Sequence, residues 1–186
     1  MLFRSTHGQT ADFTLYAQWT ANTYTVTYNS STASSGSASA SSANFTTGNT
    51  GLTLATVGTM VKTGYAFAGW STTNGGAANV SSPYSPTQNI TIYAAWTANT
   101  YTVTWNSNNG SAVSPGTTSW SYGTSLSLPA APTRSGYTFN GWYTQSSGGS
   151  KVGNASASYT PTNTANFTLY AQWTANTYTV TYNSST

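Results

Sequence analysis

The chain has 186 residues, of which four are Lys or Arg and one is Asp or Glu, so 3% are charged, against about a quarter in an average globular protein. One acid, Asp12, cannot supply the carboxylate pair that most glycosidases need, and the absence of cysteine excludes disulfides, thiolate zinc sites and thiol nucleophiles. The formal net charge of +3 comes from four scattered bases, which do not form the clustered patch of a nucleic-acid-binding protein. We therefore expect that the chain is not an enzyme and that it binds no cofactor, metal or nucleic acid.

In chain order, period-2 alternation predicts short strands, because alternation separates a buried face from an exposed one. In the first strand, Tyr24, Val26 and Tyr28 share one face and threonines take the other. A weak strand at 52–54 and one over 64–70 follow. No segment carries a convincing helical stripe, so we expect mostly strands and little helix.

The second half of the chain predicts the same kinds of strand again. They lie at 101–105, at 125–128 (weak), at 137–143 and at 169–173. Gly141, inside the third of them, indicates a β-bulge. The stretches 30–51 and 145–158 are rich in Ser, Gly, Ala and Asn, and we expect loops there.

The chain is a tandem array. The segment 14–29 returns with three substitutions at 91–106 and unchanged at 168–183, and 13–32 reappears letter for letter at 167–186. Self-similarity at a fixed period is the signature of a repeat protein. We therefore expect the C-terminal part of a preceding repeat at 1–21, a repeat unit at 22–98, a second unit at 99–175, and the first strand of a following repeat at 176–186.

A second motif, Gly-Tyr-x-Phe-x-Gly-Trp, occurs once in each unit, at 64–70 and 136–142. With the alternating strands it defines residues that we expect to be structural anchors of the repeats, with no catalytic, metal-binding or cofactor-binding residue among them. The anchors are Tyr24, Val26, Tyr28, Gly64, Tyr65, Phe67, Gly69, Trp70, Trp96, Tyr101, Val103, Trp105, Gly136, Tyr137, Phe139, Gly141, Trp142, Leu169 and Trp173.

The joint between the units is short. About four residues separate the strand that ends near Trp96 from the one that begins near Tyr101, so we expect a stiff or semi-stiff rod. The unit at 99–175 holds 12 aromatic residues and the unit at 22–98 holds nine. Because buried aromatic rings supply much of a small core, we expect the first unit to be the looser.

Three motifs of the second unit occur in order: the strand and turn at 101–110, Pro-Thr-Arg-Ser-Gly-Tyr-Thr-Phe-Asn-Gly-Trp-Tyr at 132–143, and Leu-Tyr-Ala-Gln-Trp at 169–173. They resemble the Listeria-Bacteroides repeat family, which includes the internalin B-repeat of bacterial surface proteins. The resemblance implies a small β-grasp-like (α+β) fold and an extracellular spacer or adhesion role. Gln172 stands where the family often carries Lys, and the first unit lacks the Pro-Thr lead-in.

Four features of the sequence could each have a specific function, and each also has a simpler structural explanation. The Gly-Tyr-x-Phe-x-Gly-Trp motif could stack on glycans, but a repeated core strand is favoured. The threonine rows at 23–27 and 100–104 could be an ice-binding array, but the solvated face of a strand is favoured. Lys62 or Lys151 could form isopeptide crosslinks, yet the only acid is Asp12, so none is expected in the complete units. A triad of His7, Asp12 and a serine is disfavoured, because neither His7 nor Asp12 recurs in the other repeats.

The low charge bears on assembly. Charged residues and prolines guard strand edges against pairing with other chains, and both are scarce here. We expect an extracellular or bacterial cell-surface stalk or fibre with no membrane insertion in this segment, whose partners are neighbouring repeats and other copies of the chain. The alternative is an adhesin module that binds surface glycans or host proteins through exposed aromatic residues.

Overall fold

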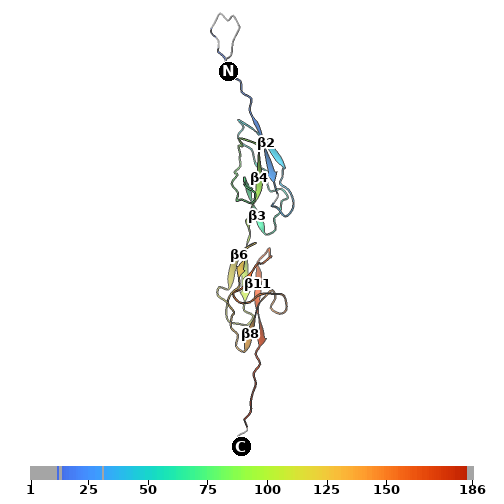
Figure 1. Cartoon of the computed structure of the whole chain (residues 1–186), viewed down its shortest axis with the longest axis vertical. Coiled ribbons are helices and arrows are strands. Elements are labelled where there is room, and N and C mark those ends of the chain that lie inside the picture. Colours follow the sequence, from blue (N-terminus) through green and yellow to red (C-terminus); the bar gives the residue numbers. More distant parts are fainter. Residues whose placement is uncertain (1–11, 13, 31, 184–186) are drawn as a thin grey trace.

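A computed structural model describes Asp12, residues 14–30 and residues 32–183 of the chain. These residues form eleven strands and no helix, so the expectation of a β-rich tandem protein is confirmed. The strands form two groups, arranged end to end along an elongated molecule (Figure 1). They are β1 (Thr23–Asn29), β2 (Ser42–Thr46), β3 (Tyr65–Ser71), β4 (Ile90–Ala98), β5 (Thr100–Asn106), β6 (Thr117–Ser121), β7 (Leu126–Ser127), β8 (Tyr137–Tyr143), β9 (Lys151–Gly153), β10 (Ser158–Tyr159) and β11 (Phe167–Ala175).

The first repeat, as we name the part from β1 to β4, is built on a four-stranded sheet. Its strand order is β2-β1-β4-β3. The two central strands, β1 and β4, run parallel, with Val26 opposite Ile90 and Tyr28 opposite Ile92. The outer strands β2 and β3 pair antiparallel with these central strands. The first and last strands of the repeat therefore meet at the centre of its sheet.

The second repeat, from β5 to β11, has the same arrangement with more of it in regular strands. Its main sheet has the order β6-β5-β11-β8-β9, and β5 runs parallel to β11. A two-stranded sheet of β7 and β10 completes it. In the first repeat, isolated bridges between Trp70 and Val80 and between Leu52 and Tyr84 stand where β8 pairs with β9 and β7 with β10.

Both stretches that were expected to be loops contain strands, so that prediction is wrong at these positions. β2 lies inside 30–51, and β9 and the start of β10 lie inside 145–158. Each is short, and β2 has one large apolar residue, Phe45, which is buried. Such segments lack the alternation of large residues that marks a strand in sequence. Their neighbours β1, β8 and β7 supply the backbone partners that make them strands.

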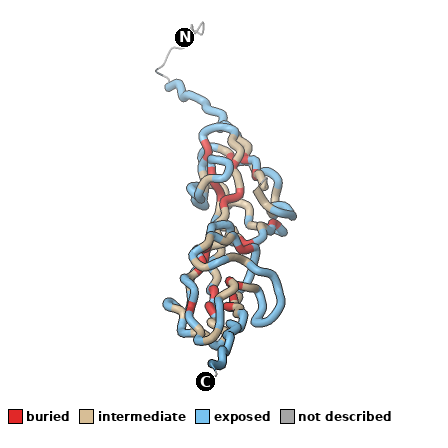
Figure 2. The backbone as a smooth tube through the Cα atoms, turned by 60° about the horizontal axis from the view of Figure 1, so that its bottom comes forward, coloured by how far each residue is buried: buried red, intermediate tan, exposed pale blue. Residues whose placement is uncertain are grey.

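Each repeat encloses its own apolar core, and buried residues lie in both halves of the molecule (Figure 2). The second core is formed by Val103, Trp105, Trp120, Leu126, Leu128, Trp142, Leu169 and Ala171. The first is smaller and is formed by Val26, Tyr28, Met60, Trp70, Ile92 and Ala94. The first repeat thus has a smaller buried cluster and fewer paired strands than the second.

The predicted bulge is confirmed, and it occurs in both repeats. Pairing of β3 with β4 skips Ala68, and pairing of β8 with β11 skips Asn140. The glycine that follows each skipped residue has positive φ, 134° at Gly141, a conformation that glycine tolerates readily. The extra residue shifts the alternation, so Trp142 points into the core and Tyr143 is only half-buried.

Candidate functional site

A chain of aromatic contacts runs through the core of the second repeat. The ring of Trp105 lies 5.3 Å from that of Trp142, which lies 5.7 Å from Phe139, which in turn lies 5.5 Å from Trp173. The rings of each pair are close to edge-to-face, an arrangement favoured by the aromatic quadrupole. Trp142 is fully buried, and its indole Nε1 donates to the carbonyl oxygen of Pro129 at 3.2 Å.

The first repeat contains the same aromatic chain at equivalent positions. Tyr28 contacts Trp70 at 4.8 Å, and Phe67 lies 5.6 Å from Trp70 and 5.7 Å from Trp96. Trp70 is 2% exposed. The indoles of the repeated Gly-Tyr-x-Phe-x-Gly-Trp motif are therefore inside the two cores. A sugar cannot stack on a buried ring, so the motif's tryptophan is not a glycan platform.

The other anchors lie around these aromatic chains, mostly on the core side of the sheets. Val26, Tyr28, Val103, Trp105 and Leu169 are buried. Tyr24, Phe67, Trp96, Tyr101, Phe139 and Trp173 are half-buried. Tyr137 is the exception, because it is the first residue of β8 and is 38% exposed.

The threonine rows lie on the solvent face of β1 and β5, as predicted. Thr23 and Thr27 in β1 and the three threonines of β5 are exposed, and Thr25 is half-buried. A repeated asparagine secures each of these strands. Asn89 accepts a hydrogen bond from the backbone N–H of Thr25 at 2.9 Å, and Asn166 accepts the same bond from Thr102 at 2.8 Å. Sequence reasoning missed this contact, although the same asparagine recurs after 77 residues.

The two repeats meet at a joint, which we define as Gly64, Tyr65, Asn99, Tyr122 and Gly123. Asn99 is the one residue between the end of β4 and the start of β5, so the connection is shorter than the four residues expected. Its N–H donates to the carbonyl of Gly64 at 2.9 Å, and its carbonyl accepts from the N–H of Tyr122 at 2.9 Å. The connecting residue is therefore hydrogen-bonded to both repeats.

Aromatic contact across the joint adds to these hydrogen bonds. The rings of Tyr65 and Tyr122 pack edge to face with centroids 5.6 Å apart. Gly64 has φ +78°, and a Cβ placed there would lie 2.3 Å from the ring of Tyr122. At the equivalent Gly136, with φ +75°, a Cβ would meet nothing within 4 Å. The close approach of the two repeats thus requires a glycine at position 64. Gly64 and Tyr65 were predicted as anchors, whereas Asn99, Tyr122 and Gly123 were not singled out.

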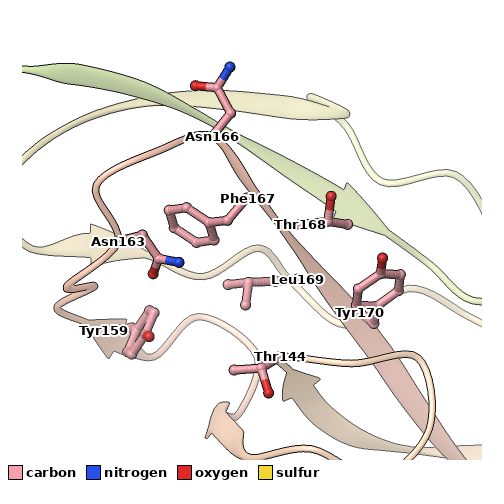
Figure 3. Close-up of a pocket in the computed structure, with 8 residues that line it drawn as sticks. All are labelled: Thr144, Tyr159, Asn163, Asn166, Phe167, Thr168, Leu169 and Tyr170. Carbon is pink, nitrogen blue, oxygen red and sulfur yellow. The ribbon is translucent and has the colours of Figure 1, made fainter.

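An open groove lies on the side of the second repeat, along the start of β11 (Figure 3). Its volume is about 360 Å³. The rings of Tyr159 and Phe167 and the side chain of Leu169 line its interior, with Asn163, Thr144 and Tyr170 around them. Aromatic faces and amide groups of this kind can contact a neutral polar ligand.

The described charged side chains are dispersed. The ammonium group of Lys62 lies 4.5 Å from the ring centroid of Tyr65, and the guanidinium group of Arg134 lies 3.7 Å from that of Tyr137. Lys151 is exposed at the start of β9, and Asp12 is exposed. His7 and Arg4 lie outside the described residues. No group of three His, Cys, Asp or Glu residues that could hold a metal occurs in the described part of the chain.

The sequence of the chain matches the family model of the Listeria-Bacteroides repeat domain twice, at residues 24–95 and 101–172. The chain belongs to the Listeria-Bacteroides repeat family. The two matched stretches cover most of the first and second repeats, from β1 into β4 and from β5 into β11. The resemblance inferred from the motifs at 101–110, 132–143 and 169–173 is therefore confirmed.

Similar sequences are found within large bacterial proteins. The chain is 34% identical to a protein of Evansella cellulosilytica described as a Gly-rich membrane protein, over 94% of its own length and 20% of that relative. It is 38% identical to internalin H of Listeria monocytogenes over 62% of its length and 20% of internalin H. A second Evansella membrane protein is 40% identical over 52% of the chain and 14% of the relative. The chain spans a fifth or less of each of these proteins.

Within the described residues, no helix is long and apolar enough to cross a membrane.

Proposed function

We propose that the chain is a structural, non-enzymatic segment of a bacterial cell-surface protein, which projects as a stalk or forms part of a fibre. The joint is the observation that carries the proposal. One residue, Asn99, separates the central strands of two sheets and is hydrogen-bonded on both sides. A connection of this kind fixes the orientation of one repeat relative to the next, as a spacer requires. A flexible linker would not fix that orientation.

The relatives support a surface location. Two of these relatives are membrane proteins by name and one is an internalin. The chain aligns with a fifth or less of each, which fits a repeated segment that holds other parts of a long protein at a distance. An extracellular setting also suits a chain with 3% charged residues and many Ser, Thr and Asn side chains.

We further propose that the repeats are β-grasp-like units with boundaries at 22–98 and 99–175. Numbered within a repeat as first to fifth, the strands β5, β6, β8, β9 and β11 have the order second-first-fifth-third-fourth, with the first and fifth parallel. That mixed order supports the assignment. The segments around β7 and β10, rather than a helix, cover one face of this sheet, because Leu126, Leu128 and Tyr159 pack in its core.

Small-angle X-ray scattering of the 186-residue chain tests the stalk proposal. We expect a pair-distance distribution with two maxima, as for two units placed end to end along one axis. A compact particle with the repeats folded side by side would contradict the proposal. Immunolabelling of intact cells of the source organism tests the surface location. Labelling that appears only after the cells are lysed would contradict it.

A second candidate, glycan binding, is favoured by the groove of Figure 3. The groove presents Tyr159 and Phe167 beside the amide of Asn163, at neutral charge. Screening on a glycan array checks it, with Asn163→Ala as the variant that should lose a hit and Asn44→Ala, on an exposed strand edge of the other repeat, as the control. Binding that survives Asn163→Ala, or no hit at all, removes this candidate.

A further inference from the structure

The two central strands of each repeat are also its first and its last strand. In the first repeat, residues 26–29 of β1 pair in parallel with residues 90–93 of β4. In the second repeat, residues 103–106 of β5 pair in parallel with residues 167–170 of β11. The backbone therefore enters and leaves each repeat through one pair of neighbouring strands, which we name the terminal pair.

The parallel direction of the terminal pair decides how a pull on the molecule acts on it. The chain enters the first repeat at one end of the elongated molecule and leaves the second repeat at the other (Figure 1). Because β1 and β4 run the same way, tension between these two ends draws them in opposite directions along their own axes. Tension acts in the same way on β5 and β11, since Asn99 alone connects β4 to β5.

A pair of strands resists a pull along its axis better than a pull across one of its ends. The hydrogen bonds between strands lie across the strand direction. A load along the strands must therefore shear all the bonds of the pair together, so the bonds share the force. A load across one end breaks the bonds one after another, so each bond in turn carries the whole force. Tension along the array thus acts on the terminal pairs in the direction of higher resistance.

A side-chain hydrogen bond extends each terminal pair by one residue. The side-chain oxygen of Asn89, which directly precedes β4, accepts from the backbone N–H of Thr25 at 2.9 Å. Asn166, which directly precedes β11, accepts from the N–H of Thr102 at 2.8 Å. Thr25 and Thr102 each stand one residue before the paired stretch of their strand. The bond therefore joins the same two strands that tension draws apart, and it does so in both repeats.

The rest of each repeat lies outside the path of tension. β2 and β3 pair with the outer sides of β1 and β4, and the chain between β1 and β4 bears no load while the terminal pair holds. Rupture of the pair would release that chain, which is about 200 Å long when fully extended. The four residues that each strand contributes to the pair therefore decide whether a stalk under tension keeps its length.

We propose that each repeat is a mechanical clamp, in which the terminal pair bears tension applied along the array. This inference rests on the proposed stalk role and states what load the stalk withstands. A stalk that connects a cell to another surface is under tension whenever the two are drawn apart. The joint passes this tension from one clamp to the next without slack, because a single residue separates β4 from β5.

Pulling one molecule in two directions with optical tweezers tests the clamp. The chain has no cysteine, so handles attach at two introduced cysteines, all at exposed positions. Thr20→Cys with Thr177→Cys applies tension along the array. Thr20→Cys with Asn49→Cys peels β2 from β1, because Thr23 and Thr46 lie opposite each other at one end of that antiparallel pair. We expect the steps that release about 200 Å along the array to need a several-fold higher force than the peeling step. An equal or lower force along the array would overturn the proposal.

Two asparagines that bind the same threonine provide matched variants. Asn89 binds the N–H of Thr25 from the β4 side, whereas Asn44 accepts from the hydroxyl of Thr25 at 3.1 Å from the β2 side. Asn89→Ala should lower the force of one large step along the array and leave the peeling force unchanged. Asn44→Ala should lower the peeling force and leave the force along the array unchanged. Equal effects of both variants in both directions would contradict the clamp, because they would reflect general stability instead of a path of load. If either variant fails to fold, the two pulling directions of the otherwise unaltered chain decide the proposal.

Failure of the clamp leaves the stalk proposal standing. A chain that yields as easily along the array as across it, yet scatters X-rays as an elongated particle, is a spacer that is not built for tension. A chain that is compact in solution contradicts the stalk itself.

Discussion

Tyr28 and Trp105 occupy the same position in the two repeats, and their polar atoms differ in what they bind. The indole Nε1 of Trp105 donates to the hydroxyl of Thr118 at 2.9 Å. The hydroxyl of Tyr28 is the one buried side-chain polar atom of the described residues that lacks a hydrogen-bond partner. A buried polar group without a partner costs about 1–3 kcal/mol, so this hydroxyl weakens the smaller of the two cores.

We predict that Tyr28→Phe stabilises the first repeat by about 1 kcal/mol, because it removes the unpaired hydroxyl and keeps the ring. Urea unfolding followed by tyrosine and tryptophan fluorescence measures the change. Tyr182→Phe is the matched control, since Tyr182 is the residue equivalent to Tyr28 where the segment 14–29 recurs at 168–183, and it is 90% exposed. Destabilisation by Tyr28→Phe would show that the hydroxyl has a partner.

Trp142 is the residue on which the second core most depends. It is 0% exposed and contacts both Trp105 and Phe139. Trp142→Ala should therefore destabilise the second repeat by about 3–5 kcal/mol, the usual cost of deleting a large buried aromatic side chain. Trp19→Ala, at a position 91% exposed, should change stability by less than about 0.5 kcal/mol. Comparable losses in the two variants would contradict this assignment of the core.

At the scale of the elements, sequence reasoning predicted the strands that carry large residues at alternate positions, namely β1, β3, β4, β5, β8 and β11. It also predicted the glycine bulge. It did not predict β2, β6, β9 or β10, because two to five residues with at most one large aromatic ring lack a readable period. Those strands depend on the edge that a neighbour offers. The side of the bulge to which Trp142 points could not be predicted either, because one skipped residue reverses the alternation that follows it.

The joint provides a matched pair of glycines for a test at this scale. Gly64→Ala and Gly136→Ala both force a non-glycine residue to positive φ, at about 1–2 kcal/mol each. Gly64→Ala in addition drives a methyl group against the ring of Tyr122. We predict that amide hydrogen exchange at Asn99 and Tyr122, whose N–H groups bond across the joint, accelerates in Gly64→Ala only. Equal protection in both variants would mean that the contact at Gly64 does not hold the joint.

At the scale of the whole molecule, stability comes from aromatic cores and neutral hydrogen bonds. The chain has a single side-chain carboxylate, Asp12, and it is exposed. Ion pairs therefore cannot be a main source of stability. The same shortage of charge is the feature from which self-association is expected, and that expectation stays a prediction.

We predict that the urea midpoint of unfolding does not fall when sodium chloride is raised from about 0.01 M to about 1 M, although the Debye length drops from roughly 30 Å to 3 Å. In a chain held together by charge pairs, this change would weaken the folded state. A marked fall in the midpoint would therefore mean that charge pairs, rather than aromatic cores and neutral hydrogen bonds, stabilise the fold.

The central claim is that the joint holds the two repeats in one fixed orientation, as a stalk needs. Spin labels attached through Thr53→Cys and Ser147→Cys, both at exposed positions in a chain with no other cysteine, report the distance between repeats by pulsed electron paramagnetic resonance. A rigid joint predicts one narrow distance distribution, which broadens in Gly64→Ala and stays narrow in Gly136→Ala. A broad distribution in the unaltered chain would contradict the claim, because repeats that swing about Asn99 cannot form a stiff spacer.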